Sequence, residues 1–133
     1  MNETEKMVAK FVGGLGSKRY TEIFSVLESY GLKPLGKSNT ETLLFQFKDE
    51  KSVAHDIFAF RLSQPPVISF PQSYWLSRSD EMSSHLAKFT YSERPKTEGP
   101  VSESQYSAGQ IELSRATQER VVAMCKTVCS RFE

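Results

Sequence analysis

The chain has 133 residues, of which 38% are hydrophobic and 25% charged, and its 17 basic and 16 acidic side chains leave a formal net charge of +1. This length suits one domain, residues 1–133, with one hydrophobic core. The composition is that of a globular protein rather than a disordered chain. Because the two signs of charge are nearly balanced, no global field attracts the chain to nucleic acid or to an anionic membrane.

The first two segments predict helices. Apolar residues at helical spacing within 3–12 follow Asn2, a residue type that caps helices, and precede Gly13. A stronger apolar stripe runs from 18 to 30 and stops at Gly31, a residue type that ends helices. We therefore expect two helices before the first strand.

Four short strands are predicted next, at residues 32–35, 43–47, 57–62 and 67–70. The turns between them are short, at 36–39, 48–51 and 63–66. Strands joined by short turns pair with their sequence neighbours, so we expect an antiparallel meander. The residues after the last of these strands are polar and aromatic, and we expect them to form an exposed rim.

The remainder of the chain predicts two more helices and one more strand. A helix begins at Ser77 or Ser79. The segment 91–110 contains glycine, proline and many serines without periodicity, and loops of that length in compact domains are either functional or mobile. Residues 111–113 predict a short strand, and 114–132 predict a final helix with one apolar side.

Together these elements predict an α+β fold. We expect an antiparallel meander sheet of four to five strands, covered on one face by three to four helices. The other face is expected to remain bare. Sheets covered on one side often bind a partner on the bare face or along an edge strand.

Two short motifs resemble catalytic or binding motifs but fail on spacing. The run 13–18 is rich in glycine and ends in lysine, yet it follows a predicted helix and lacks the spacing of a phosphate loop. We interpret it as a turn between helices. His55 and Asp56 are adjacent, and adjacent residues on a strand point to opposite faces, so they suit a turn better than a catalytic pair.

The remaining histidine and the cysteines also favour structural roles. His85 lies on the apolar stripe of its predicted helix, where a half-buried structural histidine is expected. Cys125 and Cys129 are four residues apart on a helix, a geometry that suits two buried thiols better than a disulfide. No further ligands have metal-binding spacing, so we expect neither a metal nor a cofactor.

Cysteine usage and hydropathy predict the compartment. Reduced thiols suit the cytosol. The first residues have no secretory leader pattern, and no apolar stretch approaches the length of a membrane span. We therefore expect a soluble, cytoplasmic protein without a membrane contact.

Two similar polar clusters are the candidates for recognition. Gln72, Tyr74 and Trp75 follow the last meander strand, and Gln105 and Tyr106 lie within the long loop. Amides and hydroxyls donate and accept hydrogen bonds, while tyrosine and tryptophan provide wide, stiff contact surface. The same groups would also serve to attach the loop to the sheet, and this structural alternative remains open.

Arg61 is a further candidate because it interrupts an apolar strand. An unpaired guanidinium is costly to bury. Either Arg61 pairs with a carboxylate such as Glu112, or it holds an anionic group of a ligand.

These features favour a small non-enzymatic protein-binding module of the inhibitor, immunity-factor or adaptor type, which docks on a protein partner through an aromatic and polar surface. The oligomeric state is not predicted.

Two alternatives belong to other classes. One is a nucleotide-binding or nucleic-acid-binding domain, or a small enzyme, with a pocket between the segment 91–110 and the sheet. There Arg61 would hold phosphate, a tyrosine would stack on a base, and His55 or His85 would transfer a proton. The other is an RNA-binding or DNA-binding sheet on which aromatics such as Phe58 and Phe60 stack against bases.

Overall fold

A computed structural model describes residues 2–13, 17–37, 42–61, 67–87, 89, 91–93, 107–113 and 117–132. In chain order the elements are α1 (Glu3–Val12), α2 (Ser17–Ser29), β1 (Lys33–Lys37), β2 (Thr42–Lys48), β3 (Ala54–Arg61), β4 (Val67–Pro71), α3 (Gln72–Trp75), η2 (Leu76–Arg78), α4 (Ser79–Leu86), β5 (Tyr91–Glu93), β6 (Ser107–Glu112), α5 (Gln118–Cys129) and η5 (Ser130–Phe132).

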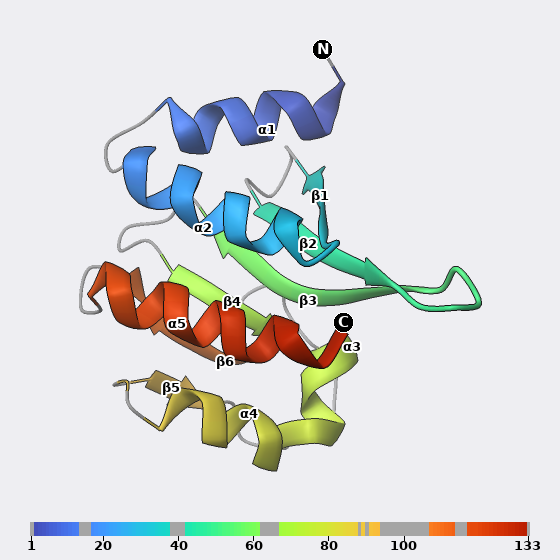
Figure 1. The fold of residues 1–133 in the computed structure, drawn as a ribbon, viewed down its shortest axis with the longest axis vertical. Coiled ribbons are helices and arrows are strands. Elements are labelled where there is room, and N and C mark those ends of the chain that lie inside the picture. The colour runs from blue at the N-terminus through green and yellow to red at the C-terminus, as the bar shows by residue number, and fades with distance from the viewer. Residues whose placement is uncertain are drawn as a thin grey trace.

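The strands form one six-stranded sheet in the order β1-β2-β3-β4-β6-β5 (Figure 1). Every neighbouring pair is antiparallel. The first four strands follow one another as a meander, so the predicted α+β class and meander are confirmed. The predicted loop 91–110 begins with β5 and ends within β6, while its residues 94–106 lie outside the described part. A three-residue strand such as β5 is too short to leave a periodic signal in the sequence.

The helices lie on one face of the sheet, as expected. The ring centroids of Phe11 in α1 and Phe24 in α2 lie 6.4 Å and 5.1 Å from that of Phe60 in β3. Met82 of α4 packs on the same face, because a Cβ added to Gly109 of β6 would lie 3.1 Å from its sulfur. Figure 1 shows α1, α2, α5 and α4 as one layer in front of the strands.

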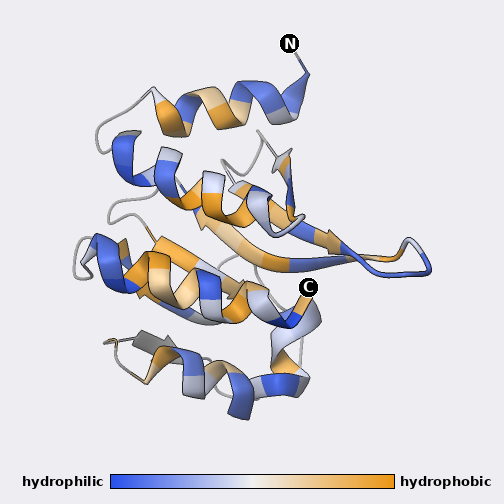
Figure 2. Ribbon diagram, in the orientation of Figure 1, coloured by the Kyte–Doolittle hydropathy of each residue, from blue (hydrophilic) through white to orange (hydrophobic). Residues whose placement is uncertain are grey.

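One continuous hydrophobic core fills the space between the helix layer and the sheet. It extends from α1 and α2 at one end to α4 and α5 at the other. Figure 2 shows the apolar residues concentrated on the strands and in bands along the helices. Among the described residues, no helix has the length and apolar character that crossing a lipid bilayer requires.

The ends of the first two helices agree with the sequence prediction. The side chain of Asn2 accepts a hydrogen bond of 2.8 Å from the backbone N–H of Glu5, which caps α1. Gly31 ends α2 with a φ of 90°, a conformation that glycine adopts without strain. The backbone N–H of Leu32 then donates to the carbonyl of Leu27 at 3.1 Å, which completes a Schellman motif.

The last helix is shorter than predicted. The hydroxyl of Thr117 accepts from the backbone N–H of Arg120, and α5 begins at the next residue, Gln118. Residues 114–116 lie outside the described part. After Cys129 the chain tightens into η5, which carries Arg131 towards α4.

The hairpin between β2 and β3 extends away from the body of the molecule (Figure 1). At its tip the carboxylate of Asp49 accepts hydrogen bonds from the backbone N–H groups of Lys51 at 2.9 Å and Val53 at 3.0 Å. Ser52 adopts a positive φ of 64° in the same turn. The predicted charged turn at 48–51 is therefore present, but it continues to Val53.

His55 and Asp56 lie in β3, so the expectation that they form a turn pair is wrong. A bulge opposite Phe45 and Gln46 lengthens β3, and a strand interrupted by a bulge loses its alternating pattern in the sequence. As expected for adjacent residues on a strand, the side chains of His55 and Asp56 have different hydrogen-bond partners. Asp56 accepts from the amide of Gln46 at 2.7 Å, whereas His55 lies 3.1 Å from Asp49.

The edge strand β1 is protected by α1. The backbone N–H of Gly36 points away from β2 and donates to the hydroxyl of Thr4 at 3.0 Å. Pro34, two residues earlier on the same side, has no N–H to offer. Because the outward donors are used or missing, β1 is a poor template for an added strand.

The close contact between α1 and β1 depends on glycine. A Cβ at Gly36 would lie 2.8 Å from the Cα of Thr4 and from the Cβ of Met7. Gly36 and Lys37 thus belong to β1, although the sequence predicted them in a turn. The rest of that turn, and the predicted turn 63–66, lie outside the described residues.

Candidate functional site

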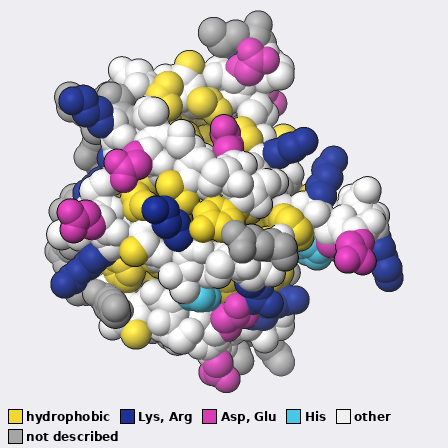
Figure 3. Space-filling view, viewed as in Figure 1, with side chains coloured by type: hydrophobic (Ala, Val, Ile, Leu, Met, Phe, Trp, Pro, Cys, Tyr) yellow, Lys and Arg dark blue, Asp and Glu magenta, His cyan; other side chains and the backbone are white. Residues whose placement is uncertain are grey.

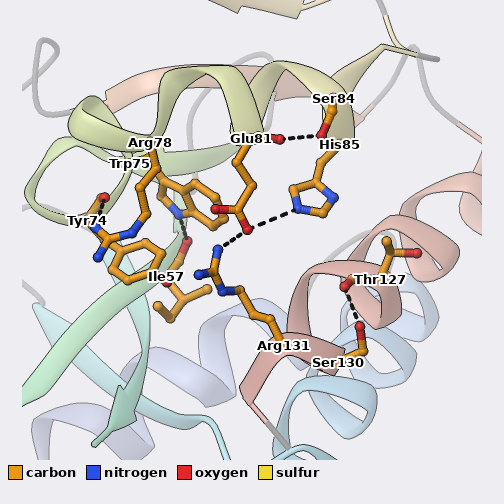
Figure 4. Close-up of polar contacts among 10 residues, drawn as sticks. All are labelled: Ile57, Tyr74, Trp75, Arg78, Glu81, Ser84, His85, Thr127, Ser130 and Arg131. Atoms are coloured by element: carbon orange, nitrogen blue, oxygen red, sulfur yellow. Dashed lines mark hydrogen bonds and ion pairs between the residues drawn. The ribbon is translucent and has the colours of Figure 1, made fainter.

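Charged and aromatic side chains gather where α3, η2 and α4 meet the end of α5 (Figure 4). We call this cluster the arginine corner and define it as Tyr74, Arg78, Glu81, His85 and Arg131. Four of these residues come from one stretch of chain, and Arg131 joins them from 50 residues further along.

Arg78 is held against Tyr74 by two contacts. Its Nη1 donates to the backbone carbonyl of Tyr74 at 2.8 Å, and its Cζ lies 4.0 Å from the centroid of the tyrosine ring. Residues four apart in a helical stretch are neighbours, so the path through α3 and η2 brings the guanidinium onto the ring. A cation over an aromatic face is attracted by the ring's quadrupole. The guanidinium is therefore fixed in place and keeps further N–H donors for another group.

Arg131 approaches the same tyrosine ring from η5. Its Cζ lies 5.8 Å from the centroid of Tyr74 and 5.7 Å from that of Phe132. Its Nη1 donates to the Oε1 atom of Glu81. Both side chains of this ion pair are about one third exposed, at 36% and 34%. The pair links α4 to the end of α5 but stabilises the fold by no more than roughly 1 kcal/mol, because solvent screens it.

His85 lies behind Glu81 on the same face of α4. Its Nε2 is 3.8 Å from the Oε1 of Glu81, which is too far for a hydrogen bond. That nitrogen is buried and has no hydrogen-bond partner among the described groups. The side chain is 14% exposed, and its burial lowers the pKa of His85, so the imidazole is neutral at pH 7.

The charges of the arginine corner do not cancel. Two guanidiniums face one carboxylate, and the imidazole is neutral, so the corner carries one excess positive charge. In Figure 3 a histidine, an acidic and a basic side chain adjoin on the lower part of the visible face. The hydroxyl of Ser84 donates to the backbone carbonyl of Glu81 at 2.7 Å, so this hydroxyl is already engaged. Guanidinium groups with free N–H donors are of the type that forms charge-assisted hydrogen bonds with anions.

Trp75 does not lie on an exposed rim, and that expectation was wrong. The segment expected to be extended is the helix α3, and Trp75 is completely buried within it. The indole N–H donates to the backbone carbonyl of Ile57 at 2.8 Å, and the ring packs 5.1 Å from that of Phe70. A buried indole whose N–H donates to a backbone carbonyl of a bulged strand belongs to the core.

The neighbouring candidates divide between the core and the surface. Tyr74 is only 6% exposed, because arginines cover it. Gln72 is half-buried at the start of α3 and makes contacts of its own. Gln105 and Tyr106 lie outside the described residues. Of the candidates named from the sequence, Tyr74 belongs to the arginine corner, whereas the charged side chains around it were not among those candidates.

Arg61 lies on the sheet face that the described helices leave uncovered. The strand register places Arg61 opposite Val67, and Val67 opposite Glu112, so the three form one row across β3, β4 and β6. Arg61 and Glu112 each interact with other residues, so neither is a free charge. The arrangement agrees with a structural role for Arg61 as well as with the anion-holding role considered above.

The central positions of that uncovered face expose little surface. Ala59, Val67 and Ser69 are all less than a tenth exposed. Phe58 and Phe60, suggested as stacking platforms for bases, point to the helix face instead and are fully buried. The stacking hypothesis is therefore wrong for these two rings.

The second histidine, His55, forms a separate pair with Asp49 in the β2–β3 hairpin. The Nε2 of His55 lies 3.1 Å from the Oδ2 of Asp49, and both side chains are 36% exposed. The hydrogen bond from His55, with backbone donors, lowers the pKa of Asp49. The His55 ring also lies 5.9 Å from that of Tyr74, edge to face.

The cysteines are buried and unreactive in this environment. Cys125 and Cys129 are free thiols on the core side of α5. Burial raises the pKa of Cys125, and it raises the pKa of Cys129 to about 12. Both are thus protonated at neutral pH. Within the described part of the chain, no three His, Cys, Asp or Glu side chains are placed to hold a metal ion.

Comparison with known proteins gives no match: no family model, no curated protein and no solved structure resembles this chain significantly.

The arginine corner was only partly visible in the sequence. The spacings of Tyr74 to Arg78 and of Glu81 to His85, four residues each, are signals of neighbouring side chains. The approach of Arg131 depends on how α5 packs beside α4, and no local pattern reports that packing.

Proposed function

We propose that this chain is a small non-enzymatic protein-binding module of the cytosol, and that it docks on its partner through the arginine corner. The observation that carries this proposal is that Arg78 and Arg131 both lie on the ring of Tyr74, opposed by the single carboxylate of Glu81. The partner is a protein segment that presents negatively charged groups.

The residue types of the corner support a protein interface. Arginine and tyrosine are over-represented among the residues that dominate binding energy. Packing on Tyr74 restricts the rotamers of both arginines before a partner arrives, which reduces the entropy lost on association. The partly exposed side chain of Phe132 adjoins Arg131 and Tyr74 and offers apolar surface beside them.

The charge distribution favours a protein partner over a nucleic acid. Binding to a phosphate backbone requires several basic residues arranged along one face. The corner has one excess positive charge, and the whole chain has a formal charge of +1. A compact acidic group on a protein matches this pattern better than a polyanion does.

The uncovered sheet face is the weaker candidate for docking. Its central side chains expose little area, and its charged residue Arg61 is already engaged. Its edge strand β1 is protected by α1. The free thiols of α5 are compatible with the reducing compartment included in the proposal.

Affinity capture with matched charge variants tests the proposal. We would compare the natural chain, the double variant Arg78→Gln with Arg131→Gln, and the control Lys10→Gln with Lys126→Gln, which removes the same charge from exposed positions on α1 and α5. We expect the natural chain and the control to retain the same proteins from a native lysate, and the arginine variant to lose them with an unchanged circular dichroism spectrum. Equal retention by all three proteins would refute docking at the corner.

A further inference from the structure

We propose that Glu81 is an internal occupant of an anion site in the arginine corner, and that a doubly charged oxyanion of the phosphate-monoester type displaces it from Arg131 towards His85. This inference rests on the proposed function, since the phosphate group would be carried by a phosphorylated segment of the docking partner. Beyond the proposed function, it specifies that the recognised group is a phosphate and that the Glu81 carboxylate competes with this phosphate for Arg131.

The position of one oxygen atom is the main evidence. The Oε1 of Glu81 accepts from the Nη1 of Arg131 and lies 3.8 Å from the Nε2 of His85. In Figure 4 the carboxylate stands between the guanidinium and the imidazole. A rotation of the Glu81 side chain that moves this oxygen by about 1 Å would bring it within hydrogen-bond distance of the Nε2 of His85.

His85 gains from this movement. Among the described residues its buried Nε2 has no hydrogen-bond partner, and an unsatisfied buried polar atom is destabilising. When Glu81 turns towards it, Nε2–H can donate to the carboxylate. The imidazole then takes up one proton from solvent, because a carboxylate in contact favours the charged form of histidine.

The two guanidiniums determine the class of ligand. Arg78 uses one N–H on the carbonyl of Tyr74, and Arg131 would be released by Glu81. With respect to the described residues, both would then have N–H donors available beside one ring. A single external carboxylate brings no advantage over Glu81, which is already attached to the protein. A tetrahedral dianion has the charge and the oxygen atoms to accept from both guanidiniums, and phosphate groups suit arginine in this way.

The coupling predicts the direction of the pH dependence. Anion binding is accompanied by proton uptake at His85, so lower pH strengthens binding. Within the described part of the chain, the charged and titratable groups with contacts in the corner are Glu81 on α4, Arg78 and Tyr74 from η2 and α3, and Arg131 on η5. The His55 ring lies 5.9 Å from that of Tyr74, and its Nε2 pairs with Asp49 rather than with a residue of the corner.

Sulfate is the probe of choice, because it remains a dianion from about pH 5.5 to about pH 8 while histidine titrates. We would measure sulfate binding by chemical-shift titration across this range. For the natural chain we expect affinity to rise as the pH falls, by at most about tenfold per pH unit because one proton is coupled to binding. O-phosphoserine should shift the same protein resonances as sulfate does, whereas serine should not shift them.

Four variants separate the steps. Glu81→Gln should bind sulfate about fivefold more tightly at pH 8 and lose most of the pH dependence, because the competitor is gone. His85→Gln should bind as the natural chain does at pH 8 but gain little at pH 5.5. Arg131→Gln should lose binding. His55→Gln is the control and should keep the full pH dependence.

The outcomes distinguish this inference from the proposed function. If Glu81→Gln bound sulfate no better than the natural chain, or if His85→Gln kept the rise at low pH, the exchange of Glu81 would be refuted. If sulfate and O-phosphoserine failed to bind while the arginine variant still lost its captured proteins, docking at the corner would stand and phosphate recognition would fall. Binding of sulfate to the Arg131 variant would mean an adventitious ion only.

Discussion

The clearest test of the fold concerns Trp75, the only tryptophan of the chain. The side chain is fully buried, and its N–H donates to the Ile57 carbonyl in the bulged part of β3. Trp75→Ala removes the ring and leaves a cavity, which destabilises a protein by about 3–5 kcal/mol. It also leaves the Ile57 carbonyl unpaired in the core, at a further cost of about 1–3 kcal/mol.

This loss is large relative to the total stability. Domains of this kind have free energies of unfolding of about 5–15 kcal/mol. Near the melting temperature, 1 kcal/mol corresponds to about 4 °C for a chain of this length. We therefore expect Trp75→Ala to lower Tm by about 20 °C or to prevent folding altogether.

Trp75→Phe separates packing from hydrogen bonding. Phenylalanine retains an aromatic ring next to Phe70 and Tyr74 but cannot donate to Ile57. We expect a loss of about 2 kcal/mol, or about 8 °C in Tm. Thermal and urea unfolding followed by far-ultraviolet circular dichroism would measure both variants without relying on tryptophan fluorescence. A Tm for Trp75→Ala within about 2 °C of the natural chain would show that the indole is not part of the core, and the reasoning would be refuted.

Three further predictions concern the backbone, the thiols and the hairpin. Gly36→Ala should destabilise the fold by at least about 2 kcal/mol, because the new Cβ meets backbone atoms of α1. Gly31→Ala should destabilise it by only about 1 kcal/mol, from the positive φ alone. Equal urea midpoints for the two variants would contradict the close packing of α1 on β1. Cys125 and Cys129 should react with a thiol reagent only after unfolding, and rapid labelling of the native protein would show that α5 is not packed as described. The pKa of Asp49 is lowered in the folded state, so the stabilising contribution of its carboxylate is full above the unfolded pKa, near pH 4, and disappears as pH falls through the folded pKa. Asp49→Asn should therefore flatten the decline of Tm between about pH 4 and pH 2. An unchanged decline would argue against the hydrogen bond from His55 to Asp49.

Much of the fold could be predicted because its signals are local. The stripe of α2 and the glycine at position 31 define the helix and its end, through side-chain periodicity and a conformation that favours glycine. Alternation in β2 and the short turn at 48–51 imply a hairpin in the same way. These features depend on neighbours within a few residues, so composition and spacing alone are sufficient.

The local signal failed where the backbone departs from regular periodicity. The bulge in β3 obscured the strand at His55 and Asp56. The tight contact with α1 extends the strand predicted at 32–35 through Gly36 and Lys37, which were predicted in a turn. In both places the deciding contacts come from another element. Tertiary packing overrides secondary-structure propensity in such places, because the free energy of a buried contact exceeds a propensity difference of a few tenths of a kilocalorie per mole.

The amino-acid sequence by itself determined the helices α1 and α2, the antiparallel meander and the presence of one apolar core. Tertiary structure alone decided that Trp75 is buried and that Arg78 and Arg131 meet on Tyr74. An aromatic residue next to polar neighbours suits an interface and a core equally well, because its area is favourable to bury in both. Only the docking of α5 beside α4, which brings together residues 50 positions apart, determines which side chains reach the surface and which charges they meet.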